Sequence, residues 1–225
     1  MKSHIANTEP IASAADLSPS RGVSTVKKLA ATALLGLATV SFGNAQVPDC
    51  APGNLSDYEK LGPEGCLIGD KKFTNFQYHR EAAGLPSDAI SLTPGTTPDT
   101  DDPGLLFEAK WASASRESFV SYNVEVQPNG KPITGASLQM QFGTITGTGT
   151  ATVLADLCSS DSTTDSCGSQ KLELKVVLSA SGPKTPEANG HFKEPQKEIH
   201  VVTPVDLVAG SGGSAAMDGF MAVFR

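Results

Sequence analysis

Three aspartates in the Pro- and Gly-rich stretch 93–104 come nearest to the spacing of a metal site. Asp99, Asp101 and Asp102 supply closely spaced carboxylates, and Ca²⁺ prefers oxygen ligands. An EF-hand counted from Asp99 would need a glutamate at its twelfth position, where Lys110 stands. The full motif therefore fails. The cofactor that the sequence leaves open is calcium, held by these carboxylates and by backbone oxygens of a loop, with a solvated acidic loop as the alternative.

The chemistry of catalysis finds less support. The chain has no GxSxG nucleophile motif. Glu108 and Glu125 could be the paired carboxylates of glycoside cleavage, but each falls on the polar face of an expected strand. His191 and His200 form neither an HxH nor an HExxH pattern. A non-catalytic protein is therefore expected, with a glycan-active enzyme as an alternative.

Three further residues are candidates for function but fit structural roles better. Asp70 lies in a Gly-Asp-Lys sequence that is typical of a turn before a strand. His79 would be an exposed histidine at the end of that strand. Trp111, the single tryptophan, falls on an inward face and is expected in the core rather than as a sugar platform.

Four cysteines indicate the redox compartment. Cys50, Cys66, Cys158 and Cys167 lack CxxC spacing and neighbouring histidines, which argues against zinc. An even number in an exported chain favours two disulfides. Three pairings exist, and Cys50–Cys66 with Cys158–Cys167 is favoured because the members of each pair are close in sequence.

The first 45 residues predict export. Lys27 and Lys28 precede an apolar run over 29–42, and small residues at Gly43 and Ala45 suit cleavage after Ala45. The run is too short to span a membrane, so no membrane span is expected after cleavage. We expect a signal peptide over 1–45, one domain over 46–225, and secretion to the periplasm or the extracellular space. The net charge of −7 is spread along the chain, which disfavours nucleic acid as a partner.

Alternation of apolar and polar residues dominates after residue 70, and helical periodicity is nearly absent. Such short, half-buried strands separated by turns predict an all-β fold, an antiparallel β-sandwich of jelly-roll or immunoglobulin-like type, stapled by disulfides. The expected strands are 73–79, 105–111, 119–126, 137–142, 150–157, 171–178, 198–202 and 219–224.

Turn chemistry separates the expected strands. Asn129-Gly130 is a hairpin signal. The stretches 93–104 and 181–190 are expected to be loops, and 209–214 a glycine-rich turn. One short helix is expected over 56–62, with Ser56 as its N-cap.

The stretch LGPEGCLIGDKKFTNFQY, residues 61–78, resembles the start of a group of uncharacterised exported bacterial proteins. These usually carry a PEP-CTERM sorting tail, and PGLLFEAKW (103–111) and SYNVEV (121–126) extend the resemblance. It implies export, a β-rich domain, and exopolysaccharide or envelope components as partners, with no catalytic residues to carry over. The sequence ends in MAVFR without such a tail, so release is expected instead of surface sorting.

The sequence thus favours a secreted, non-catalytic binding or structural module of the cell envelope or extracellular matrix. A glycan-active enzyme and a calcium-dependent adhesion module are the alternatives.

Overall fold

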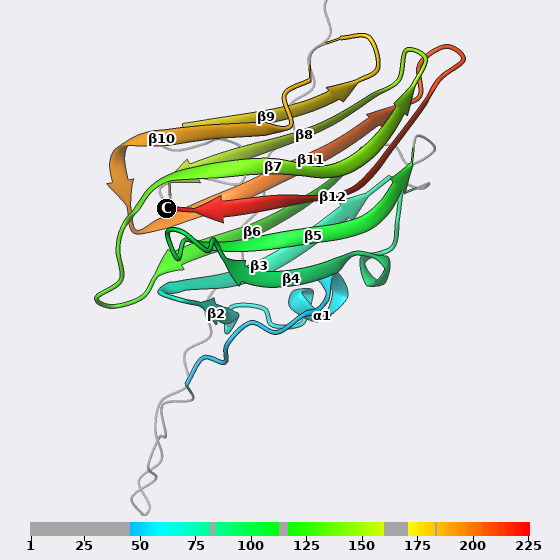
Figure 1. Cartoon of the computed structure of the whole chain (residues 1–225). Coiled ribbons are helices and arrows are strands. Elements are labelled where there is room, and N and C mark those ends of the chain that lie inside the picture. The colour runs from blue at the N-terminus through cyan, green and yellow to red at the C-terminus, as the bar shows by residue number, and fades with distance from the viewer. Residues whose placement is uncertain (1–45, 82–83, 113–116, 160–170, 183) are drawn as a thin grey trace, which may run out of the picture. The chain divides into compact units, whose positions relative to one another are not determined.

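The computed structural model describes residues 46–81, 84–112, 117–159, 171–182 and 184–225 (Figure 1). The expected signal peptide and Cys167 lie outside these residues. About two thirds of the described residues are β-strand, arranged in two six-stranded sheets whose neighbouring strands are antiparallel. The prediction of an all-β sandwich is confirmed.

Sheet I has the order β1-β4-β5-β12-β7-β10, and sheet II has the order β2-β3-β6-β11-β8-β9. The strands of sheet I are β1 Gly53–Asn54, β4 Ser91–Thr96, β5 Pro103–Ala112, β12 Ser214–Phe224, β7 Ile133–Thr146 and β10 Glu187–Gln196. The strands of sheet II are β2 Cys66–Ile68, β3 Lys71–Arg80, β6 Ser118–Val126, β11 Glu198–Val208, β8 Thr150–Ser159 and β9 Lys171–Ser179. The helical elements of the described residues are α1 Leu55–Glu59 and one 3₁₀ turn, η1 Ser87–Ala89.

The core lies between the two sheets because each long strand turns alternate side chains inward. Tyr122 of β6 is fully buried at its centre. Its ring centroid lies 6.0 Å from that of Phe107 on β5 and 6.3 Å from that of Phe224 on β12. These contacts join sheet II to sheet I. Trp111 is also buried, as predicted.

Strand β3 departs from simple alternation. Phe73 and Phe76 are three residues apart, yet both are buried. The register with β6 shifts between Thr74 and Gln77, and Asn75 has a φ of 54°. This bulge inserts one extra residue, so that both aromatic rings reach the core.

Two expected loops contain strands. Residues 91–96 and 103–104 pair within sheet I, which shortens the loop expected over 93–104 to 97–102. Strand β10 begins at Glu187, inside the loop expected over 181–190.

The signal at Asn129-Gly130 does form a turn, in which Gly130 N–H donates to the Gln127 carbonyl at 2.8 Å and Asn129 has a φ of 72°. It is not a hairpin, because β6 and β7 belong to different sheets. The helix begins two residues earlier than expected, with Asn54 and not Ser56 as its N-cap.

A disulfide joins Cys50 to Cys66, with the two Cα atoms 4.8 Å apart. It holds the segment before β1 against β2, where Cys50 N–H also donates to the Leu67 carbonyl at 2.8 Å. Cys158, on β8, is disulfide-bonded as well. Its expected partner Cys167 lies outside the described residues. No helix among those residues has both the length and the apolar character needed to cross a membrane.

Candidate functional site

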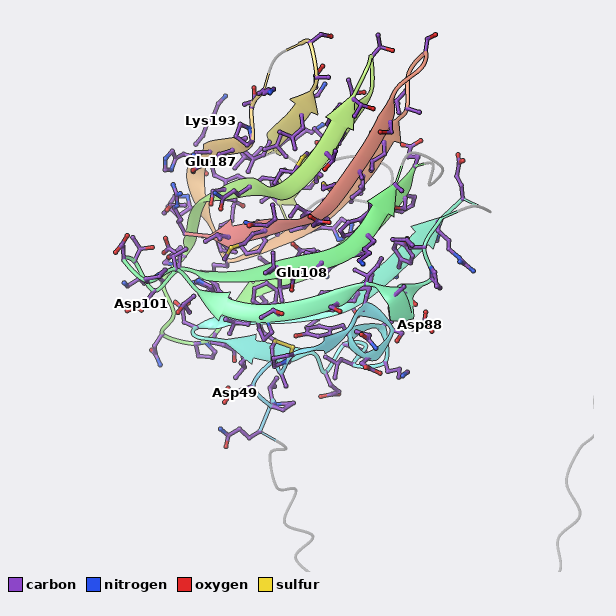
Figure 2. All side chains as sticks on the ribbon, turned by 45° about the vertical axis from the view of Figure 1, so that its right-hand side comes forward. Asp49, Asp88, Asp101, Glu108, Glu187 and Lys193 are labelled. Carbon is purple, nitrogen blue, oxygen red and sulfur yellow. A yellow bond between two sulfur atoms is a disulfide. The ribbon has the colours of Figure 1, made fainter. Side chains whose placement is uncertain are left out.

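The three aspartates of the expected calcium loop do not point at a common centre. Thr100 Oγ1 donates to Asp102 Oδ2 at 2.6 Å, and Arg225 Nε lies 3.8 Å from the same oxygen. Asp101, at the tip of the β4–β5 loop, is exposed (Figure 2), as is Asp99. Within the described ranges, no three His, Cys, Asp or Glu side chains form a group that could hold a metal. Calcium binding here stays a prediction.

The two glutamates considered for glycoside cleavage lie on different sheets. Glu108 is exposed on β5 of sheet I (Figure 2), and Glu125 is exposed on β6 of sheet II. Both side chains point outward, so the whole sandwich separates them. They cannot act together on one glycosidic bond.

The outer face of sheet II carries a stacked pair of rings. His79 on β3 and Phe119 on β6 are directly paired in the sheet register. Their ring centroids are 4.8 Å apart and their planes differ by 20°. Phe119 is 37% exposed and is one of only two large hydrophobic side chains exposed in the described part of the chain. Because His79 is exposed as well, the two stacked rings form a small aromatic surface that is open to solvent.

A hollow of about 250 Å³ adjoins these rings. It is lined by His79, Arg80, Glu81, Glu117 and Phe119. The guanidinium of Arg80 is partly engaged within the chain, because its Nη1 donates to the Gly84 carbonyl at 3.1 Å. Pockets that enclose a drug-sized ligand measure ~300–1,000 Å³, so this hollow would accept a single small unit of a larger ligand.

Partly exposed apolar side chains continue the ring pair across the sheet. Pro204 on β11 is paired with Phe119. Val202 pairs with Asp156 and Val205 with Val153, and this register puts Leu154 of β8 opposite Pro204. We call His79, Phe119, Pro204 and Leu154 the aromatic row.

Polar groups border the aromatic row on one side. Gln77 is paired with Ser121. Farther along, Lys171 Nζ lies 3.1 Å from Asp156 Oδ1 and 3.2 Å from Glu173 Oε2. The hydrogen bonds to Asp156 and then to Glu173 raise the pKa of Lys171. One cation is therefore shared between two carboxylates.

His200 of β11 lies on the same face, next to β6. Its Nδ1–H donates to Asn123 Oδ1 at 2.7 Å, since an amide oxygen can only accept. Burial lowers the pKa of His200. This pair is a half-buried cross-strand contact, and His191 on β10 lies on the other sheet. The two histidines therefore lie on different sheets.

Asp70 has a structural role, as the sequence favoured. Its Oδ2 accepts from Lys131 N–H at 2.6 Å, and its backbone carbonyl accepts from Gln127 N–H at 2.9 Å. The carboxylate thus holds the β6–β7 turn against the start of β3.

A second hollow, of about 240 Å³, lies beside the Cys50–Cys66 disulfide. Tyr58 lines it, but the Tyr58 hydroxyl donates to the Ala51 carbonyl at 2.9 Å. Asp57 lines it too, and its carboxylate accepts from Lys60 Nζ at 2.8 Å. The Tyr58 hydroxyl and the Asp57 carboxylate are therefore already hydrogen-bonded within the chain.

Sequence reasoning did not identify the aromatic row, although one signal was present. The alternation over 119–126 turns Val120, Tyr122 and Val124 inward, which puts Phe119 on the polar face. An aromatic side chain on the outward face of a strand must either be exposed to solvent or pack against another side chain on that face. Its neighbours His79 and Pro204 belong to distant segments, and only the strand register brings them together.

No protein-family model matches the sequence, and no curated protein does at a significant score. Among solved structures, the chain is similar to TmCBM61 in complex with β-1,4-galactotriose, with 13% identity and a TM-score of 0.31, over 67% of this chain and 88% of that chain. It is also similar to the enzymatically active domain of tailspike protein 4 of bacteriophage CBA120, with 8% identity and a TM-score of 0.27, over 70% of this chain and 20% of that chain. At these scores neither likeness supports a conclusion about function.

Proposed function

We propose that this chain is a secreted, non-catalytic binding module whose ligand is a polysaccharide of the cell envelope or extracellular matrix. The observation that carries the proposal is the exposed His79–Phe119 stack beside a small hollow with two carboxylates. The apolar C–H face of a sugar ring can pack on an aromatic ring, while its hydroxyls donate to carboxylates at the edge. A β-sandwich presents such a site on a rigid sheet, so little ordering is needed on binding.

A second candidate function is glycoside cleavage, because Glu81 and Glu117 line the same hollow. That reaction needs one carboxyl that stays protonated, which enzymes achieve by burying it. Both side chains are exposed. The binding role therefore has the better support.

The test is retention of the oxidised protein on insoluble polysaccharides, including the exopolysaccharide of the producing organism. The variants are Phe119→Ala and the control Val208→Ala, which truncates the other large exposed hydrophobic side chain, at the end of β11. We expect that Phe119→Ala abolishes retention and that Val208→Ala leaves it unchanged. Equal retention of both variants would contradict the proposal.

Two further readings separate the alternatives in the same experiment. Released reducing sugar that disappears with Glu81→Gln or Glu117→Gln would replace binding by catalysis. Retention that is lost on adding a chelator would assign the contact to the Asp99–Asp102 loop instead, since calcium would then be required.

A further inference from the structure

The aromatic row is longer than the hollow at its end. It crosses β3, β6, β11 and β8, and Lys175 on β9 is the next residue in register after Leu154. Neighbouring strands are about 4.8 Å apart, so the four strands of the row span roughly 14 Å. That length exceeds a single sugar ring and fits several units of an extended chain laid across the strands.

The charges beside the row are predominantly negative. Glu81 and Glu117 line the hollow, so two carboxylates stand there beside the single guanidinium of Arg80. Asp156 and Glu173 share the single cation of Lys171.

Asp206, exposed on β11 two residues beyond Pro204, adds a further carboxylate, and Lys175 is a cation at the far end. The whole chain has a net charge of −7. A polyanion would be repelled by this face, whereas a cationic chain would be attracted to it.

We infer that the aromatic row binds an extended glycan that carries free amino groups. This inference rests on the proposed function and narrows its ligand from any polysaccharide to a cationic one. Sugar rings lie over the side chains of the row, and protonated amines face Glu81, Glu117 and the carboxylates that flank the row.

Two matched probes isolate charge. The hexamer of β-1,4-linked glucosamine and the same hexamer with every amine acetylated differ only in the amino groups. Titration calorimetry with the full protein at low salt should show the amino form binding at least about tenfold tighter. One exposed ion pair is worth up to about fivefold in affinity, and more than one amine of the hexamer faces a carboxylate. A hexamer of galacturonic acid should bind more weakly than either. Raising the salt should reduce the preference, because exposed pairs are screened.

A double variant tests whether the preference for the amino hexamer depends on the two carboxylates at the hollow. Glu81→Gln with Glu117→Gln should reduce the preference for the amino hexamer by several-fold. The control is Glu108→Gln with Asp218→Asn, which removes the same charge from sheet I and should leave the preference intact. Thermal melting of every variant verifies that it is folded.

Comparing a short and a long glycan measures how far the site extends across the sheet. Leu154→Ala, remote from the hollow, should weaken binding of the amino hexamer and leave the dimer unaffected. Equal loss for dimer and hexamer would overturn the extended site.

Three results overturn the cationic ligand: equal affinity for amino and acetylated hexamers, tighter binding of the acidic hexamer, or no binding of the amino hexamer. The proposed function fails on a different observation. It fails if retention on insoluble polysaccharide does not depend on Phe119.

Discussion

The ammonium of Lys71 lies 2.6 Å from the carboxylate of Asp70, although the Lys71 side chain is only 3% exposed. Lys71 Nζ also donates to the Lys131 carbonyl at 2.7 Å. A buried ammonium is unfavourable without a counter-charge and hydrogen-bond acceptors. This pair therefore connects the first long strand of sheet II to the turn that leads into sheet I.

Asp70→Asn should destabilise the protein by about 2–3 kcal/mol, because it leaves the Lys71 ammonium without its counter-charge. This is below the ~3–5 kcal/mol of a fully buried pair, since the Asp70 side chain is 35% exposed. Urea unfolding measures it. Lys71→Met should cost less, because the remaining carboxylate reaches solvent. The exposed Asp57–Lys60 pair provides the control, and Asp57→Asn should change little. A larger loss for Lys71→Met than for Asp70→Asn would refute this account.

The same carboxylate predicts a pH dependence. Burial acts to raise the pKa of Asp70, but the hydrogen bonds from Lys71 and Lys131 outweigh it and hold the pKa below its ordinary value of 3.8. A lowered carboxyl pKa stabilises the folded state above the unfolded pKa, and that stability is lost as the pH falls through the folded value. The stability difference between the wild type and Asp70→Asn should therefore be full above about pH 4 and shrink below it. A difference that persists unchanged at pH 2 would contradict the role of the charge.

His200 predicts a second pH window. Burial lowers its pKa below the ordinary 6.5, so the unfolded chain binds a proton more readily than the folded one. The contribution of His200 to the free energy of unfolding should be constant above pH 6.5. Below that value, the free energy of unfolding should fall as the pH drops. His200→Gln should flatten this part of the profile. NMR titration of the imidazole signals measures the pKa directly.

Tyr122→Phe should stabilise the protein. The Tyr122 hydroxyl is buried and has no hydrogen-bond partner among the described residues, and burial raises its pKa. Removing an unsatisfied hydroxyl of this kind should gain about 1 kcal/mol, or roughly 2–4 °C in Tm for a domain of this size. The matched control is Tyr58→Phe, which loses the bond to Ala51 and should lower the Tm. A drop in Tm for Tyr122→Phe would reveal a partner for its hydroxyl.

Replacing Cys50 and Cys66 together by alanine should lower stability by about 3 kcal/mol on the chain-entropy estimate, since the two cysteines are 16 residues apart. Thermal unfolding of the oxidised proteins measures the loss. Adding reductant should lower the Tm of the variant less than that of the wild type. Identical Tm values for the two oxidised proteins would show that the bond does not constrain the unfolded chain.

The sequence predicted the strands that are buried on one face. Trp111 and Tyr122 fall on the inward phase of their strands, and the structure buries both. Strand β10 was missed because it is an edge strand whose only large buried side chain is Phe192. Apolar alternation cannot reveal a strand that buries so little.

Turn chemistry is local, so Asn129-Gly130 predicted a turn correctly. Which sheet receives the next strand is decided by pairing with distant residues, so the change of sheet could not be predicted. The candidate site depends on register in the same way. His79 and Phe119 are forty residues apart, and their stacking follows from the pairing of β3 with β6.

The order of the strands has a kinetic consequence. Successive strands repeatedly change sheets, and the central pairs of sheet I join segments that are remote in the chain, as Phe107 on β5 pairs with Phe220 on β12. Neither sheet can form from one continuous segment. Because such loop closures must precede the contacts that reward them, proteins of this topology fold in milliseconds to seconds. A newly made chain would therefore expose its apolar strand faces for a comparatively long time before the two sheets close over them.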